Sequence, residues 1–512
     1  MRASALPLQQ VHLRITDAAT GKPTPVRLRI TDAAGTYYAP YGRLTEFATG
    51  ANQDVGGNVM IGTKKWAYID GACETLLPPG LLHIEIAKGP EYTPIDETIT
   101  LLAGKLSLRF TIERWSDVRK QGWYSGDTRV HFLSPDAALL EGQAEDVAVV
   151  NLLIEPAEVY DQHAKSSDAL PNILSFSGQA FARQAVGCGV AVNTLNSHMW
   201  HGFLALLHCH RVVHPLRFGG LNQQDNQTLA DWCDQCHRKK GLVIWAEPLH
   251  ASVYFAYGEP LADMILGKVD AIEMSTFRNS CDDAVADYYC FLDTGIVIPL
   301  VGASGKSSNG TVLGTMRTYA NLPLDSPVTY RTWIEAVRAG RTYASNGPLL
   351  DFRIDDAVPA SGTPIFSRDK PLRIRASVRS LAAFDWLEIV WNGAIIGESH
   401  ASSGPLWEAV LEHELNVRGS GWLAVRCRGR TLVEGRRIPN FVFAHTSAIA
   451  VHGSEAGSWV LPRQVEKLMD ALDAMLRWAK EIARCDSPAQ RKRLCHVFEE
   501  ARTMLAKKLS SH

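Results

Sequence analysis

The spacing of apolar residues changes twice along the chain, and these changes constrain the fold more than any other feature. In residues 1–117 apolar and polar residues alternate, as in Val11–Ile15. Residues 351–450 return to this pattern, for example in Leu387–Trp391, which is followed by the hairpin signal Asn-Gly. Such alternation is typical of half-buried strands in antiparallel sheets. We therefore expect a β-sandwich in each of these two regions.

Between them, residues 118–350 contain short, nearly continuous apolar runs, several of them separated by helical patterns. The runs are Val147–Ile154, Val190–Val192, Leu242–Trp245, Val269–Met274 and Ile296–Val301. Runs of this kind are typical of parallel strands that are buried on both faces, so the region is predicted to form a β/α layer or barrel. In such folds ligands bind where strands end and loops begin, which makes the residues after each run the candidates for a site.

Residues 451–512 carry two helical patterns. The apolar stripes are Val465, Leu468, Leu472, Met475 and Ala479 in the first pattern, and Leu494, Val497, Phe498, Ala501 and Leu505 in the second. Between the stripes, Ser487, Pro488 and Gln490 fit an N-cap, a first-turn proline and a capping-box glutamine. We expect a helical hairpin that packs on the body. The same helices are candidates for contacts with a protein partner or with a second copy of the chain.

Charge and composition narrow the functional classes. The 512 residues include 52 Lys and Arg against 54 Asp and Glu, without a basic run, so a nucleic-acid partner is not expected. The stretch Gln184–Cys209, which lacks these charged residues, is too polar for a membrane span. Residues 1–10 do not resemble a signal peptide. We expect a cytoplasmic protein with reduced cysteines and without a membrane partner.

One cysteine motif has two interpretations. Cys233-Asp-Gln-Cys236-His237 has the spacing of a haem c attachment site. However, Leu229, Trp232, Cys233 and Cys236 also fall at i, i+3, i+4 and i+7, the apolar stripe of an amphipathic helix that Gly241 would end. We therefore expect these two cysteines in the core.

The segment from Gly122 to Asp136, GWYSGDTRVHFLSPD, resembles the first motif of the CehA/McbA-type metallohydrolases, relatives of the PHP phosphoesterases. Further similar segments are Ala230–Cys236, Gly241–Trp245, Ile265–Glu273, Met316–Tyr319, Ala336–Thr342 and Ser345–Pro348. The resemblance covers nearly the whole chain. It implies a multidomain α/β plus β protein: a PHP-like β/α barrel at 118–350, flanked by β-sandwich domains at 1–117 and 351–450, with a C-terminal helical hairpin at 451–512.

The metal-ligand positions of this family are changed here. The family's first strand carries a His-x-His pair, whose two imidazoles lie on one face of the strand, and this chain has Arg129 and His131 instead. A carboxylate ligand near the start of the third strand would fall at Thr194 or Leu195, and neither is acidic. His131 is the clearest ligand that is retained.

Two later positions differ as well. After the run Leu242–Trp245 the family has a histidine, and this chain has Glu247. The family's Gly-Thr-Asp ligand motif becomes Ala303-Ser304-Gly305, although the following Lys306 is kept. The resemblance places Lys306 in the active-site loop, where it could bind a small anionic ligand. Asp127 is expected to act as a turn or supporting residue at the edge of the pocket.

These changes lead to our main hypothesis. Arginine stays protonated in proteins and cannot ligate a metal. If Arg129 and Glu247 face the same cavity, they could form an ion pair in the place of the metal. The protein would then need no cofactor and would act as a non-catalytic binding or scaffolding protein, with a pocket of Asp127, Arg129, His131, Glu247, His250 and Lys306.

The alternative is a metal-dependent hydrolase of an ester, amide or phosphoester with a rearranged site. About three protein ligands and an open position for water would be needed. His131, Glu247 and His250, with His198 or His201, could supply them to one Zn, Mn or Fe ion.

Overall fold

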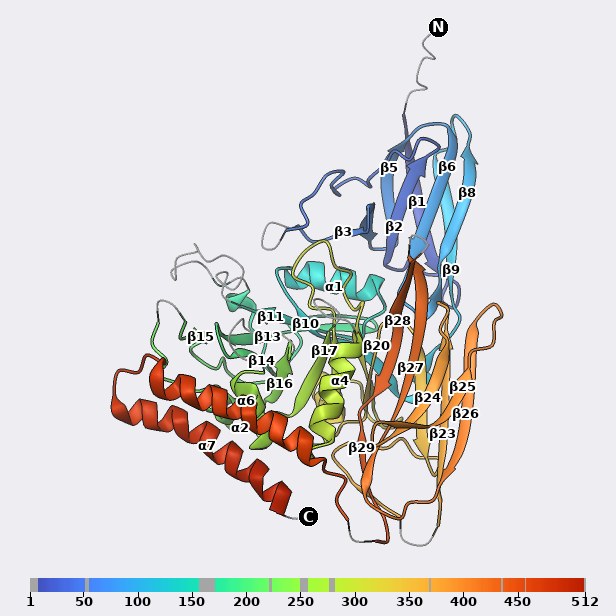
Figure 1. The fold of residues 1–512 in the computed structure, drawn as a ribbon. Coiled ribbons are helices and arrows are strands. Elements are labelled where there is room, and N and C mark those ends of the chain that lie inside the picture. The colour runs from blue at the N-terminus through green and yellow to red at the C-terminus, as the bar shows by residue number, and fades with distance from the viewer. Residues whose placement is uncertain are drawn as a thin grey trace.

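The computed structural model of the chain describes residues 8–50, 55–155, 170, 172–220, 223–248, 257–275, 281–367, 370–433, 436–455 and 457–510. Within them the protein is mixed α/β and mostly sheet, with several separate sheets, one of them curled, and seven α-helices. Figure 1 shows the N-terminal strands at one end, the central strands and helices in the middle, and the C-terminal helices along one side.

Two sheets form the N-terminal region. One has the order β5-β1-β9-β7 and the other β3-β4-β2-β6-β8. Their bounds are Gln9–Asp17 (β1), Val26–Asp32 (β2), Asn58–Ile61 (β3), Lys64–Ile69 (β4), Ala72–Leu77 (β5), Gly80–Ala87 (β6), Tyr92–Thr93 (β7), Ile95–Leu101 (β8) and Ser107–Arg114 (β9). The predicted alternation is present, because the apolar residues of β1 and β2 lie in one shared core. Pairing is not wholly antiparallel, since β1 and β9 run parallel.

The central strands belong to a 17-stranded sheet. They are Trp123–Val130 (β10), Val149–Ile154 (β11), Arg183–Ala185 (β12), Cys188–His198 (β13), Gly202–Leu207 (β14), Arg217–Phe218 (β15), Leu242–Ala246 (β16), Ala271–Ser275 (β17), Leu300–Ala303 (β18), Arg317–Asn321 (β19) and Thr342–Ser345 (β20). Parallel pairs join β10 to β11, β11 to β13, β16 to β17 and β17 to β18. Four of the apolar runs therefore lie largely within strands, as predicted, whereas Ile296–Val301 overlaps β18 only at Leu300 and Val301.

The order of these strands differs from a plain parallel arrangement. β14 lies antiparallel between β13 and β16. The run Val190–Val192 is part of an eleven-residue strand, β13, and only three residues separate β13 from β14. A parallel crossover needs a dozen or more residues, so this short turn forces the chain to return antiparallel.

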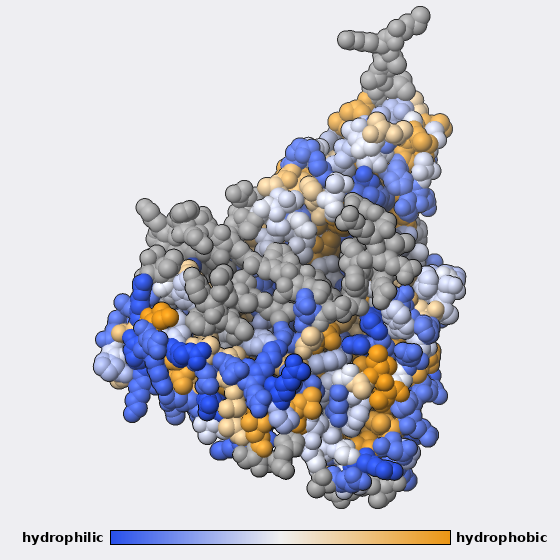
Figure 2. Space-filling view, in the orientation of Figure 1, coloured by the Kyte–Doolittle hydropathy of each residue, from blue (hydrophilic) through white to orange (hydrophobic). Residues whose placement is uncertain are grey.

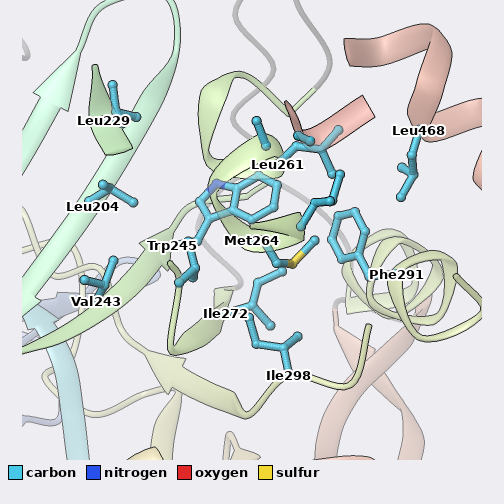
Figure 3. Close-up of a cluster of buried hydrophobic side chains, with 14 of the residues drawn as sticks. Leu204, Leu229, Val243, Trp245, Leu261, Met264, Ile272, Phe291, Ile298 and Leu468 are labelled. Carbon is cyan, nitrogen blue, oxygen red and sulfur yellow. The ribbon is translucent and has the colours of Figure 1, made fainter. Parts of the chain in front are cut away.

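Helices pack beside the central sheet. They are Pro135–Ala144 (α1), Leu229–Arg238 (α2), Glu259–Ile265 (α3), Cys281–Leu292 (α4) and Tyr330–Arg338 (α5), with 3-10 turns at Val118–Gln121 and Ile173–Ser175. In α2, Trp232, Cys233 and Cys236 are fully buried, in agreement with their assignment to the core. The close-up in Figure 3 shows Trp245 of β16 among Leu261, Met264 and Phe291 in this core.

The second β region continues the central sheet. Its strands there are Ile365–Phe366 (β22), Trp386–Trp391 (β24), Ala394–His400 (β25), Gly421–Val433 (β27), Arg436–Thr446 (β28) and Ile449–His452 (β29). Leu349–Ile354 (β21), Leu372–Ser380 (β23) and Trp407–Leu415 (β26) form a separate three-stranded sheet. β28 pairs with β20, which joins the two regions through backbone hydrogen bonds. Asn392 and Gly393 both have positive φ between β24 and β25, so the predicted hairpin turn is present.

The tail folds into α6 (Pro462–Glu481) and α7 (Pro488–Ser510), which pack on each other and on α3. The residues of both predicted apolar stripes are buried. At the start of α7 the backbone N–H of Gln490 donates to Ser487 Oγ, as the predicted N-cap requires. Figure 2 shows mainly hydrophilic residues over the hairpin on the face that the view presents.

Candidate functional site

The candidate site is built at the ends of neighbouring strands. Asp127, Arg129 and His131 lie at every second position along and just after β10, and the register of β10 against β11 shifts between Asp127 and Val130. Glu155 directly follows β11, and Glu247 directly follows β16. Because β11 pairs in parallel with β10, and β16 with β17, the topology gathers these strand ends at one edge of the sheet.

Arg129 occupies the centre of this site. Its Nη1 lies 2.8 Å from Glu247 Oε1, the contact that the sequence analysis predicted. A second edge of the guanidinium contacts Glu273 of β17. Here Nη2 donates to Oε1 at 2.9 Å and Nε donates to Oε2 at 3.0 Å. The Arg129 residue is only 1% exposed and Glu273 is 2% exposed. The guanidinium therefore bridges two carboxylates, one of them in a bidentate geometry away from water.

A glycine beside Arg129 makes this arrangement possible. Gly305 has φ +60, and a Cβ atom on it would lie 2.8 Å from Arg129 Nη2 and 3.2 Å from Arg129 Cζ. Both the backbone angle and the space thus favour glycine.

Asp127 supports the loop that follows β18. Its carboxylate accepts hydrogen bonds from the backbone N–H groups of Arg129, Ser304 and Gly314, and from the Ser304 hydroxyl. With its oxygens occupied by these donors, Asp127 fixes the position of the loop.

Lys306 is fully buried. Its Nζ donates to the backbone oxygens of Ser308 and Thr311, at 3.2 and 2.7 Å, and lies 3.4 Å from Glu141 Oε2. Because Glu141 and two carbonyl groups already surround the ammonium group, the structure shows no exposed Lys306 charge for an anionic ligand in this described part of the chain.

His131 and Glu155 form a second, uncharged pair beside Arg129. His131 Nδ1 lies 3.3 Å from Glu155 Oε1, a backbone hydrogen bond with Leu153 also contributes to the electrostatics of His131, and Glu155 Oε2 has no hydrogen-bond partner among the described residues. Burial raises the pKa of Glu155 to about 8, and burial together with Arg129 holds the pKa of His131 well below its usual range. At neutral pH both groups are therefore uncharged.

His198 and His201 lie in a different environment. His198 Nε2 is 2.9 Å from Asp225 Oδ1, and His201 Nδ1 is 3.3 Å from Glu259 Oε2. The centroids of the two imidazole rings lie 4.0 Å apart with the rings tilted by 35°, and Trp478 of α6 meets His201 edge-on at 4.2 Å. Burial lowers the pKa of His198 to about 4 and that of His201 to about 3. Both are neutral core histidines beneath the C-terminal helices.

The predicted metal ligands are thus only partly brought together. His131 and Glu247 both lie beside Arg129, whereas His198 and His201 pair with carboxylates of their own. His250 lies outside the described residues. In the described part of the chain, the one trio of His, Cys, Asp or Glu with ligand atoms within 4.8 Å of one another is His83, Glu85 and Asp96, on β6 and β8. Arg29 and Lys64 already pair with Glu85 there.

The residues around Arg129 do not fit a divalent metal. A guanidinium lies against both Glu247 and Glu273, and it would repel a cation placed between them. Gly305 offers no side chain as a ligand. His131 alone keeps the family's ligand type.

Sequence reasoning missed two residues of this site, Glu155 and Glu273. Glu155 follows an apolar run directly, so the rule that strand ends carry the site could have found it. Glu273 lies inside the run that forms β17, and its only signal was an acidic residue in an otherwise apolar strand. Such a residue is rarely buried without a partner of opposite charge.

Comparisons with known proteins do not assign the chain to a family. No family model and no curated protein matches it. Among solved structures, endonuclease Q in complex with a 27-mer duplex containing an abasic lesion matches with a TM-score of 0.25 and 14% identity, over 43% of this chain and 56% of that one. The chain thus spans little more than half the length of that protein. An FMN-binding beta-glucuronidase from Facaelibacterium prausnitzii L2-6 matches with a TM-score of 0.17 and 10% identity, over 88% of this chain and 75% of that one. Likeness at this level carries no argument about function.

None of the described helices combines the length and the apolar composition that crossing a membrane requires.

Proposed function

We propose that the protein is a CehA/McbA-type, PHP-like barrel with flanking β-sandwiches that has lost its metal centre and works as a non-catalytic binding or scaffolding protein. The observation that carries this proposal is the Arg129 guanidinium, which lies within 2.8–3.2 Å of Glu247 and Glu273. The barrel and sandwich classes rest on the sequence resemblance and on the coarser mixed α/β architecture.

The energetics support a replacement of the metal's charge. A buried carboxylate at Glu273, with the half-buried Glu247 beside it, would cost several kcal/mol without a cation. A guanidinium supplies a permanent positive charge and five N–H donors in a plane that matches carboxylates. Gly305 leaves the space that this larger cation needs. The changes at positions 129, 247 and 305 are therefore mutually consistent, since each one supports the same ion-pair network.

Metal analysis of the purified protein tests this proposal. After dialysis against Zn, Mn or Fe(II) followed by buffer alone, we expect much less than one equivalent of metal by mass spectrometry. The triple variant Arg129→His, Glu247→His, Gly305→Asp should gain metal. His83→Ala is the matched control, because it removes the separate trio on β6 and β8. Stoichiometric metal that is lost in His131→Ala but kept in His83→Ala would contradict the proposal.

One observation favours the second candidate, a hydrolase with a rearranged single-metal site. Within the described part of the chain, His131 and Glu155 present buried polar atoms for which no side-chain hydrogen bond is recorded, and imidazole and carboxylate are ligand types that Zn, Mn and Fe accept. The metal analysis above decides between the candidates. For the hydrolase, esterase, amidase or phosphoesterase turnover should follow the metal content and disappear in His131→Ala.

We propose that this binding protein recognises a protein partner or a small anionic ligand. Contacts to a partner or to a second copy of the chain would be made by α6 and α7. We also propose a location in the cytoplasm. Size-exclusion chromatography with light scattering tests the second copy. A monomeric mass that stays unchanged at high protein concentration would exclude self-association.

A further inference from the structure

Two buried cysteines that are distant in sequence meet at the start of β16. Cys209 follows β14 by two residues, and Cys236 lies in the last turn of α2. Their Sγ atoms are 3.2 Å apart. Among the nine cysteines whose side chains the structure describes, this is the pair with a recorded sulfur–sulfur contact.

The topology of the sheet produces this meeting. β14 and β16 are antiparallel neighbours, with Leu207 opposite Leu242. The chain that leaves β14 therefore runs beside the chain that connects α2 to β16. A Cβ atom on the connecting residue Gly241 would lie 2.3 Å from Cys209 Sγ and 2.5 Å from Cys236 Sγ. Both sulfur atoms thus pack against the same point of the backbone.

Hydrogen bonds hold the two segments in this register. The backbone N–H of His210 donates to the Lys239 carbonyl at 3.2 Å, and His210 Nδ1 lies 2.9 Å from the same oxygen. Lys239 Nζ donates to the Val212 carbonyl at 3.0 Å. Because the native fold already orders both cysteines, a bond between them would need little further ordering of the chain.

Access differs between the two sulfur atoms. Cys209 is 2% exposed, but its neighbours His210 and Arg211 are exposed, so Cys209 lies one layer below the surface. Cys236 lies deeper, in the core side of α2, and is 0% exposed. A small oxidant would therefore reach Cys209 first, through a local opening of the turn at His210.

We propose that Cys209 and Cys236 are a redox modification site that closes to a disulfide when the protein meets a peroxide. In the first step the Cys209 thiolate attacks one peroxide oxygen, the O–O bond breaks, and water leaves after proton transfer. In the second step the Cys236 thiol loses its proton as its sulfur attacks the resulting sulfenic sulfur, and that proton leaves with the sulfenic oxygen as a second water. The sum is two thiols and one hydrogen peroxide giving one disulfide and two waters. The sulfur atoms need to approach from 3.2 Å to about 2.05 Å.

The order of the steps follows from burial. Burial and the neighbouring Cys209 hold the pKa of the Cys236 thiol well above its usual range, so Cys236 is a poor first nucleophile. Cys236 can react in the second step, because the sulfenic sulfur of Cys209 then lies beside its own sulfur atom. The closed loop, residues 209–236, contains Asp225, whose carboxylate accepts a hydrogen bond of 2.7 Å from the backbone N–H of Arg484 between α6 and α7. Oxidation would therefore stiffen the platform on which the C-terminal hairpin docks.

Peptide mapping tests the proposal on the full-length protein. Reduced protein is treated with hydrogen peroxide under native conditions, remaining thiols are alkylated, and the digest is analysed by mass spectrometry. We expect a peptide containing Cys209 linked to one containing Cys236, with the loss of two hydrogen atoms, and its disappearance on reduction. In Cys236→Ser the linked peptide should be lost, and Cys209 should be trapped as sulfenic acid by dimedone.

Cys427→Ser is the matched control, because Cys427 is also fully buried; it should leave the linked peptide unchanged. Circular dichroism confirms that each variant is folded before oxidation. The proposal is overturned if the linked peptide forms only in denaturant. It is equally overturned if Cys209 in folded wild-type protein is no more reactive toward peroxide than Cys427.

Discussion

At the scale of single residues, the close contact between Arg129 and Gly305 predicts how a larger residue at position 305 changes the stability of the fold. Gly305→Ala places a Cβ atom against the guanidinium at a positive φ, so we expect a loss of at least about 2 kcal/mol in the free energy of unfolding. Urea denaturation measures it. Gly267→Ala is the matched control, because Gly267 has φ +70 with nothing within 4 Å of its Cβ position. An equal loss in both variants would show that Arg129 contributes no steric conflict.

The buried acid Glu155 makes a prediction about pH. Its pKa is about 8 in the folded protein, against about 4.3 in an unfolded chain. As pH rises between these values the unfolded state releases the proton first, so the folded state loses relative stability. Glu155→Gln removes this loss. We expect little change at pH 5 and a gain on the order of 2 kcal/mol at pH 8.

Thermal unfolding of both proteins across this pH range measures the effect. Glu335→Gln serves as a control, because Glu335 is half exposed in an i,i+4 pair with Arg331 and should show no such trend. A stability difference for Glu155→Gln that does not grow with pH would contradict the assignment of a protonated Glu155.

The sequence allowed part of the site to be predicted at this scale. The pairing of Arg129 with Glu247 could be foreseen, because both residues stand at strand ends and carry opposite charges. The bidentate partner Glu273 could not be foreseen, because an apolar run does not tell which of its side chains faces a strand that lies seven strands earlier in the sequence. Likewise, nothing local in the sequence separates His198 and His201 from the site, since their partners Asp225 and Glu259 come from distant segments.

At the scale of elements, the end of α6 depends on a side chain from α7. Arg491 Nη1 donates to the carbonyls of Ala479 and Lys480, and Nη2 donates to that of Ala483, each at 2.8 Å. These carbonyls would otherwise lack partners at the helix C-terminus. We expect Arg491→Leu to cost about 1–2 kcal/mol. Hydrogen exchange in the last turn of α6 should rise, while the exposed neighbour Lys492→Met leaves it unchanged. Equal exchange in both variants would rule out this capping role.

Strand positions were easier to predict than strand directions. The runs that became β11, β16, β17 and β18 show as continuous apolar segments, because strands buried on both faces need apolar residues at every position. A short apolar run has the same appearance in parallel and antiparallel pairs. The antiparallel insertion of β14 is set by the three-residue turn after β13, a length that became clear only once both strand ends were known.

At the scale of the whole molecule, the C-terminal hairpin completes a shared core. Leu468 and Phe498 of the hairpin belong to the same apolar cluster as Trp245 and Phe291 (Figure 3). A chain that ends at residue 455 would expose this surface, so we expect strong binding of the dye ANS and aggregation. Ile482→Ser in the full chain is the control, because Ile482 is 66% exposed. A truncated chain that stays monomeric and binds no dye would contradict this role of the hairpin.

The boundary expected near residue 350 is not a structural break. The ladder from β20 to β28 and the shared cluster that contains Val390, Trp422 and Trp245 unite both sides of it. Local patterning could not reveal this, because it records the period of each segment and not the long-range register between segments.

The ladder between β20 and β28 also bears on how the protein is made. As the chain emerges from the ribosome, the N-terminal sheets have their own core and can close early. The central strands must wait, because their hydrogen-bonding neighbour β28 and the covering helices α6 and α7 are synthesised last. During that interval the nascent chain carries uncovered apolar surface, and it is then that we expect the strongest dependence on molecular chaperones.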